Sequence, residues 1–203
     1  MLIEVAGIDG CGKTTLIHGL RRLINESGLA FAYERPFQSD GVRLLEAAAS
    51  EQLSVRSRPV RFFSKEIVEY VRAVELVTGS SRLRPHIGSK MQWFFTDSYI
   101  LEQAARGIRA GLDMGKFWPL LGLSAQPDHR VFIRVTAEVA VQRMSAREKG
   151  DAILLEEHPV REAANQIAAL EAAAANYGET LIVVDGHQAA RDLLKDVAAR
   201  IGL

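Results

Sequence analysis

Short, continuous runs of apolar residues alternate along the chain with longer segments in which apolar residues recur every three or four positions. The continuous runs lie at residues 2–8, 30–34, 93–97, 130–135 and 180–185. They contain many β-branched and aromatic residues and show no polar alternation, which predicts buried strands of a parallel sheet. Because these strands alternate with predicted helices, we expect an α/β fold with helices on both faces of the sheet.

Three of the intervening helices have recognisable ends. Residues 14–27 carry leucines and isoleucine at helical spacing, and Gly28 follows where a left-handed C-terminal cap is expected. Thr136 can cap a second helix, which is predicted to run to about residue 148. A third helix is predicted to begin at Pro159 and to stop at Gly178. We expect one domain over residues 1–203, since the sequence shows no repeat and no low-complexity linker.

Composition narrows the classes of partner. The 25 lysines and arginines equal the 25 aspartates and glutamates, so no basic excess points to nucleic acid or to a membrane surface. No apolar run is long enough to span a bilayer, the N-terminus lacks the pattern of a secretory signal, and the single cysteine cannot form an internal disulfide. We therefore expect a cytoplasmic protein that binds neither nucleic acid nor membrane. The five histidines show no ligand spacing, which argues against a structural metal.

A glycine-rich segment stands between the first predicted strand and the first predicted helix. Residues 7–15 read GIDGCGKTT and satisfy the pattern G-x-x-x-x-G-K-[ST] of a phosphate-binding loop. Glycines let backbone amides approach phosphate oxygens, Lys13 supplies a positive charge, and the Thr14 hydroxyl can ligate Mg²⁺. A turn that only caps the helix is the simpler alternative. The strand–loop–helix context favours a nucleoside-triphosphate site, in which Cys11 is interpreted as a small filler rather than an oxidisable thiol of lowered pKa.

Further charged residues follow the predicted strands, where open α/β sheets bind ligands. Asp97 ends the third predicted strand. We expect its side chain to be a magnesium-associated carboxylate, the N-cap of the next helix, or both. Arg143 and Arg147 lie four residues apart on one predicted helix face. This spacing indicates either a cationic lid over the phosphates or a solvated basic face. Residues 53–90 carry eight basic residues against three acidic ones, a net charge of +5 that indicates a second anion or an exposed helical face.

Five stretches of the chain follow one another in an order that resembles a known kinase family. They are GIDGCGKTT (7–15), YERPFQSDGVRLLEAA (33–48), DSYILEQAARG (97–107), AEVAVQRMSAREKGD (137–151) and LIVVDG (181–186). In that order they are similar to the phosphate loop, the arginine–glutamate–proline segment, the aspartate–arginine–tyrosine segment, the lid helix and the adenine-side loop of thymidylate kinases. Only the region from about 50 to 92 aligns poorly.

The resemblance implies a P-loop kinase fold with a five-stranded parallel sheet, and transfer of the ATP γ-phosphate to a nucleoside monophosphate in the presence of Mg²⁺. The family favours a homodimer. The acceptor-binding region would be about 50–92 and the lid about 143–156. The loop residues that would hold ATP are Asp9, Gly10, Cys11, Gly12, Lys13, Thr14 and Thr15. The residues implied in catalysis are Lys13, Asp9, Arg143 and Arg147, those implied at the metal are Thr14 and Asp97, and those implied at the acceptor are Arg35, Tyr70, Arg72, Arg82 and Tyr99.

Three departures from the family pattern bear on the acceptor. Ser98 and Ala152 stand where the family has arginines, and Arg35 stands where it has a glutamate. The resemblance predicts that the acceptor is a pyrimidine deoxynucleotide such as dTMP or a modified analogue, and the two lost arginines imply either a weaker enzyme or a changed acceptor. Two alternatives stay open: a nucleoside or small-metabolite kinase, which would need a general base such as Asp97, Glu34 or Asp9, and a non-catalytic nucleotide binder.

Overall fold

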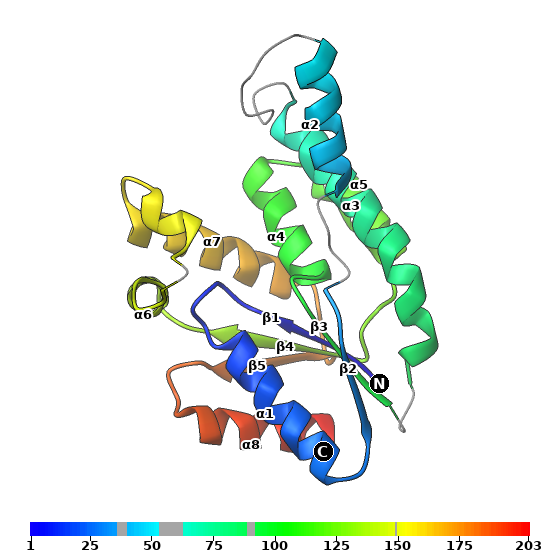
Figure 1. Ribbon diagram of the computed structural model, residues 1–203, viewed down its shortest axis with the longest axis vertical. Coiled ribbons are helices and arrows are strands. Elements are labelled where there is room, and N and C mark those ends of the chain that lie inside the picture. Colours follow the sequence, from blue (N-terminus) through cyan, green and yellow to red (C-terminus); the bar gives the residue numbers. More distant parts are fainter. Residues whose placement is uncertain (36–39, 53–62, 89–91, 149) are drawn as a thin grey trace.

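Five parallel strands form the centre of the molecule in a computed structural model of the chain (Figure 1), which describes residues 1–35, 40–52, 63–88, 92–148 and 150–203. Parts of the predicted acceptor region and residue 149 of the predicted lid lie outside the described residues. The strands are β1 (Leu2–Ala6), β2 (Ala30–Tyr33), β3 (Gln92–Asp97), β4 (His129–Arg134) and β5 (Leu181–Asp185). Their order in the sheet is β2-β3-β1-β4-β5, and every neighbouring pair is parallel. All five strand predictions are confirmed to within two residues.

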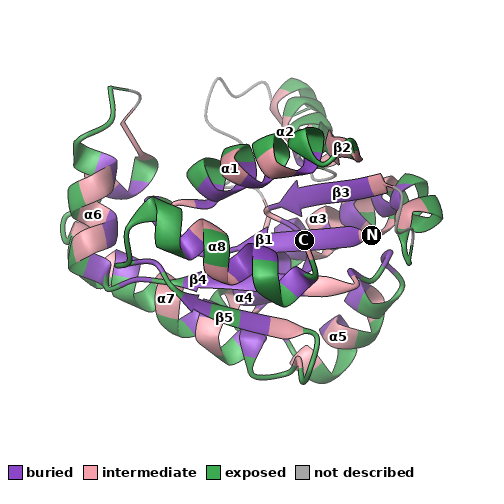
Figure 2. Cartoon of the chain, turned by 90° about the horizontal axis from the view of Figure 1, so that it is seen from below, coloured by how far each residue is buried: buried purple, intermediate pink, exposed green. Residues whose placement is uncertain are grey.

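Burial differs between the inner and the outer strands. All residues of β1 and all but the first of β3 are buried, as Figure 2 shows in purple. By contrast, β2 has no buried residue and β5 alternates between buried and exposed or half-buried positions. The prediction that all five strands are buried on both faces is therefore wrong for these two, because each lies at an edge of the sheet.

The described part of the chain contains eight α-helices in addition to the 3₁₀ helices Ser81–His86 and Ala152–Leu155. The α-helices are α1 (Lys13–Glu26), α2 (Asp40–Gln52), α3 (Lys65–Ser80), α4 (Ile100–Ala110), α5 (Met114–Gly122), α6 (Ala137–Ser145), α7 (Pro159–Ala174) and α8 (Ala190–Ile201). In Figure 1, α1 and α8 cover one face of the sheet, whereas α4 and α7 cover the other together with α3 and α5. Helix α2 packs on α3 at the far end of the molecule, and α6 lies beside the loops that follow the strands.

The helix ends agree with the sequence at three points and differ at two. Gly28 has the left-handed φ of 70°, Thr136 Oγ1 accepts a hydrogen bond from the Val139 amide at 3.4 Å, and α7 begins at Pro159. However, α7 stops at Ala174 rather than near 177, and beyond its end the Arg130 guanidinium lies over the Tyr177 ring, 4.0 Å away. Helix α6 stops at Ser145, three residues before the predicted end.

The strand connections create a crevice beside the first loop. Strands β1 and β3 are neighbours, yet α1 after β1 and α4 after β3 leave to opposite faces of the sheet (Figure 1). Such a point in a parallel sheet is where ligands bind, because the two loops separate there. The glycine-rich loop and Asp97 both stand at this crevice. No described helix is both long enough and apolar enough to cross a membrane.

Candidate active site

The loop between β1 and α1 has a backbone that only glycine adopts easily. Gly10 has a φ of 85°, and a Cβ added there would lie 2.6 Å from the carbonyl oxygen of Ala140 in α6. Gly12 has a φ of 110°, and a Cβ added there would meet nothing within 4 Å. The loop therefore packs against α6 at Gly10 and is open at Gly12, directly before the N-terminus of α1. An anion can approach the backbone amides at that open side.

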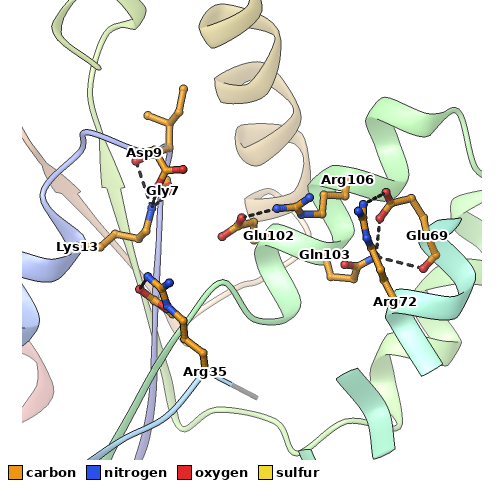
Figure 3. Close-up of polar contacts among 11 residues, drawn as sticks. Gly7, Asp9, Lys13, Arg35, Glu69, Arg72, Glu102, Gln103 and Arg106 are labelled. Carbon is orange, nitrogen blue, oxygen red and sulfur yellow. Dashed lines mark hydrogen bonds and ion pairs between the residues drawn. The ribbon is translucent and has the colours of Figure 1, made fainter. Parts of the chain in front are cut away.

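Lys13 lies folded over this loop (Figure 3). Its Nζ donates to the carbonyl oxygens of Gly7 at 2.6 Å and Ile8 at 3.3 Å, and it pairs with Asp9 Oδ1 at 3.4 Å. Burial by itself would lower the pKa of Lys13, but negative neighbours that include Asp9 and Glu102 bring the pKa above its ordinary value. Lys13 therefore carries its charge at neutral pH. The Thr14 and Thr15 side chains that follow it are exposed.

Cys11 is a packing residue of the loop. Its side chain is 1% exposed, and burial raises the pKa of its thiol. A raised pKa keeps the thiol protonated and unreactive, so the alternative of an oxidisable thiol with a lowered pKa is wrong.

Asp97 is bound by an arginine from the neighbouring strand end. Arg35, two residues after β2, donates from Nε to Asp97 Oδ1 at 2.6 Å and from Nη2 to Oδ2 at 2.9 Å. Asp97 is 1% exposed, and each of its oxygens accepts one of these hydrogen bonds. Its predicted role at the metal stays a prediction. Asp97 does not cap the next helix, because α4 begins only at Ile100 and its Tyr99 N-cap makes no side-chain hydrogen bond.

The first turn of α4 is held instead by Glu4, which sequence reasoning missed. Glu4 Oε1 accepts a hydrogen bond from the Leu101 amide at 2.7 Å, and Glu4 is fully buried. Its other oxygen lies 3.4 Å from Nε of the buried Arg130. Burial raises the pKa of Glu4 to about 7, although Arg130 and the Leu101 amide both oppose the shift. The available signal was a charged residue in the middle of the apolar run LIEVA.

Three cavities border the glycine-rich loop, and a fourth lies apart from it on α4. The largest, about 970 Å³, is here called the phosphate cleft; it borders Lys13, Thr14 and Arg35 together with Ser98, Arg147 and Ala152. The α1–α8 cavity, about 210 Å³, lies between the loop and the start of α8. The inner cavity, about 200 Å³, lies between the loop and helices α4 and α7, and the α3–α4 cavity, about 280 Å³, lies further along α4.

The two arginines predicted on one helix face are separated in the structure. Arg143 in α6 donates from Nη1 to the Gly186 carbonyl at 3.0 Å and borders the α1–α8 cavity. Arg147 lies beyond the end of α6 and borders both that cavity and the phosphate cleft. The premise that they share a helix face is wrong because α6 ends between them. Of the two, Arg147 reaches the phosphate cleft.

Three residues predicted at the acceptor site lie elsewhere. Tyr99 is fully buried, and its hydroxyl donates to the Ala125 carbonyl at 2.8 Å. The Tyr70 ring packs edge-on against Phe117 at 5.4 Å. Arg82 pairs with Glu34. None of the three borders any of the four cavities, so these predictions are corrected: two are packing residues and one is an ion-pair residue.

Arg72, by contrast, borders the α3–α4 cavity, and its role as an acceptor residue stays a prediction. Its Nη1 donates to Glu69 Oε1 at 2.5 Å, and Glu69 Oε2 accepts from Gln103 Nε2 at 3.0 Å (Figure 3). Glu69 is 8% exposed and Gln103 2% exposed. This group joins α3 to α4 and presents polar atoms beside a cavity.

Helix α4 contributes a second pair that the sequence did not single out. Glu102 Oε1 accepts from Arg106 Nη2 at 3.1 Å, one helical turn apart, and Figure 3 places the pair between Lys13 and the Arg72 group. Before the helix, Ser98 has a φ of 53°, the only left-handed non-glycine residue in the described chain. Strain of this kind concentrates at functional sites. No sequence motif marks Glu102 or Arg106, because their importance depends on the crevice that α4 faces, whereas the sequence marks Ser98 only as a departure from the family pattern.

Comparison with known proteins gives the same kinase family repeatedly. No family model matches the chain. The thymidylate kinase of Akkermansia muciniphila is 30% identical over 162 residues, covering 74% of this chain and 70% of that protein. The thymidylate kinase of Blochmanniella pennsylvanica is 25% identical over 160 residues, covering 74% and 72%. The probable thymidylate kinase of Archaeoglobus fulgidus is 26% identical over 158 residues, covering 73% and 71%.

Proposed function

Because the chain belongs to the thymidylate kinase family, we propose that its acceptor is dTMP or a modified pyrimidine deoxynucleotide. The chain is a P-loop nucleoside monophosphate kinase that uses ATP. The observation that carries the acceptor proposal is the position of the α3–α4 cavity, which lies along α4 from the phosphate cleft and is lined by polar groups of α3 and α4.

The glycine-rich loop fits the phosphates of ATP. It is open at Gly12, it carries the buried charge of Lys13, and it leads into the N-terminus of α1. The α1–α8 cavity, with Arg143 at its edge, would take the nucleoside part of ATP. Mg²⁺ would be held through the Thr14 hydroxyl and phosphate oxygens, with Asp97, which also pairs with Arg35, as the predicted carboxylate near the metal. When bound, Mg²⁺ neutralises charge on the β- and γ-phosphates.

Residues of the predicted acceptor region 50–92 would hold the base. Arg72 and Glu69 line the α3–α4 cavity, and Gln103 fixes the Glu69 carboxylate. Together they offer both donors and acceptors, which a pyrimidine edge with carbonyl oxygens and a ring N–H requires.

The proposed reaction works by positioning and charge stabilisation. An oxygen of a monophosphate is already a nucleophile, so the transfer needs no general base. Each of the three candidate bases for a hydroxyl acceptor is paired with a cation: Asp97 with Arg35, Glu34 with Arg82, and Asp9 with Lys13 at 3.4 Å. This commitment favours a monophosphate over a neutral nucleoside. Arg147 would stabilise charge that develops during transfer from the ATP side of the phosphate cleft.

ATP consumption tests the proposal. The purified protein is supplied with ATP and Mg²⁺ and with each of a panel of nucleoside monophosphates and the matching nucleosides, and products are identified by mass. Formation of dTDP, or of a diphosphate of a modified pyrimidine, is the expected result. Phosphorylation of a nucleoside would favour the small-molecule kinase instead, and ATP binding without any transfer would favour a non-catalytic binder.

We also propose that residues 1–203 act as one domain and that the protein is a homodimer. Apolar residues are exposed on α2 and α3, with Leu44 70%, Ile67 48% and Val74 50% exposed. Ile67 and Val74 are seven residues apart on α3 and so lie on the same face. An exposed apolar surface of this kind is a basis for association.

A further inference from the structure

One residue links the cavities on the acceptor side of the glycine-rich loop. Arg106 borders the phosphate cleft, the inner cavity and the α3–α4 cavity, and no other described residue borders all three. It stands on α4 between Lys13 and the Arg72 group (Figure 3). A molecule that reaches from the α3–α4 cavity into the phosphate cleft must therefore pass Arg106.

Under the proposed function, on which this inference rests, the acceptor is such a molecule. Its base would lie beside Arg72 in the α3–α4 cavity, and its phosphate must enter the phosphate cleft to meet the γ-phosphate. Two phosphates that carry negative charge repel each other at that distance, so a cation must stand beside the acceptor phosphate. We propose that Arg106 is that cation and that it binds the phosphate of the acceptor nucleotide.

The other arginines of the site are assigned by their contacts and by the cavities that they border. Arg35 is held by both oxygens of Asp97. Arg147 borders the α1–α8 cavity and belongs to the ATP side. Arg72 and Arg109 border the α3–α4 cavity but not the phosphate cleft, and they pair with Glu69 and Glu162. Arg106 is the arginine that reaches the phosphate cleft from the acceptor side.

Two neighbouring positions contribute no charge. Ser98 and Ala152 both border the phosphate cleft, and neither side chain can pair with a phosphate as a guanidinium does. The planar guanidinium of Arg106 can make two parallel hydrogen bonds to phosphate oxygens. Glu102 acts as a positioning residue, since its contact with Nη2 orients the guanidinium from the preceding turn of α4.

The test separates recognition of the phosphate from recognition of the nucleoside. Calorimetry measures Kd for dTMP and for thymidine with the wild-type protein, with Arg106→Ala and with Arg106→Lys, and Kd for ATP with Mg²⁺ is measured for each. We expect the wild-type protein to prefer dTMP over thymidine and Arg106→Ala to reduce that preference about 10- to 100-fold. Kd for thymidine and for ATP should change less than about threefold, since neither carries the acceptor phosphate that the guanidinium would bind. Arg106→Lys keeps a positive charge but cannot make the bidentate hydrogen bond, so its preference for dTMP over thymidine should lie between those of the wild type and Arg106→Ala.

Arg200→Ala is the matched control, because Arg200 forms the same kind of pair with Asp196, at 2.8 Å on α8, and borders none of the four cavities. Equal weakening of dTMP and thymidine in both Arg106 variants would show a structural role and overturn the proposal, as would an unchanged preference. A wild-type protein that neither binds nor phosphorylates dTMP would instead remove the acceptor assignment, and the role of Arg106 with it.

Discussion

At the scale of single residues, Lys13 concentrates the charge of the glycine-rich loop. Lys13→Ala should lower kcat by at least about 100-fold, since its cation beside the transferring phosphate would stabilise the transition state far more than the ground state. Steady-state kinetics with ATP and dTMP measures the loss. Lys195→Ala, an exposed position on α8, is the control and should keep full activity. Unchanged turnover in Lys13→Ala, with the unfolding transition intact, would remove the assigned site.

The separation of Arg143 from Arg147 predicts different kinetic effects for two residues only four positions apart. Arg147→Ala should lower kcat about 10- to 100-fold with less than about a threefold change in Kd for ATP, because it borders the phosphate cleft. Arg143→Ala should mainly raise KM for ATP, because Arg143 borders the α1–α8 cavity but, unlike Arg147, not the phosphate cleft. Kinetics and ATP titrations on the two variants decide this. The same profile for both would mean that they act together after all.

Residues that sequence could assign belong to one contiguous motif, and those it missed depend on contacts across the fold. Lys13 and Thr14 follow directly from the spacing of GIDGCGKTT. Glu4 acts on an amide 97 residues further along the chain, and Arg106 matters because of three cavities formed by different elements. Tyr99 was misassigned for the same reason, since nothing in DSYILEQAARG shows that this ring points into the core.

At the scale of elements, the buried Glu4 joins β1 to the start of α4 and makes stability depend on pH. Its pKa rises from 4.5 to about 7 in the folded protein, so the folded state favours the protonated form. The stabilisation from this proton is fully present below about pH 4.5 and is lost as the pH rises through 7. The shift corresponds to about 3 kcal/mol.

Glu4→Gln keeps an oxygen for the Leu101 amide and removes the titration. As the pH rises from 4.5 to 8, the wild-type protein loses this stabilisation and the variant does not. The free energy of unfolding of the variant minus that of the wild type should therefore increase by up to about 3 kcal/mol over this range. Urea unfolding at several pH values measures it, with Glu26→Gln at the exposed end of α1 as the control. A constant difference across that range would contradict the buried titration of Glu4.

Element boundaries were predictable where local chemistry sets them. The apolar runs located all five strands, and Pro159, Thr136 and Gly28 marked helix ends, because capping and backbone preference act within a few residues. The burial of β2 and β5 was not predictable, because their edge positions follow from the order of strands in the sheet. The end of α7 at Ala174 was not predicted either, and the Tyr177 ring that follows it contacts Arg130 of β4, far away in the sequence.

At the scale of the whole molecule, every residue assigned to the reaction belongs to the crevice of one chain, whereas the exposed apolar residues of α2 and α3 lie apart from it. Val74 is half-exposed, and Arg72, two residues earlier, borders the α3–α4 cavity. Two residues correspond to about 200° around a helix, so these side chains lie on opposite sides of α3. A change at Val74 can therefore act on association without entering the site.

This arrangement predicts that assembly and catalysis can be separated. Light scattering should give wild-type protein about twice the 22.4 kDa chain mass. Val74→Glu should shift it toward a single chain, because a buried unpaired carboxylate disfavours an apolar interface. Leu123→Glu, at another exposed apolar position beyond α5, should leave the mass unchanged. Since the cleft is complete within one chain, Val74→Glu should keep kcat within about threefold. A wild-type mass of 22.4 kDa would refute the dimer. Loss of activity when the dimer dissociates would show that the partner chain supports the site.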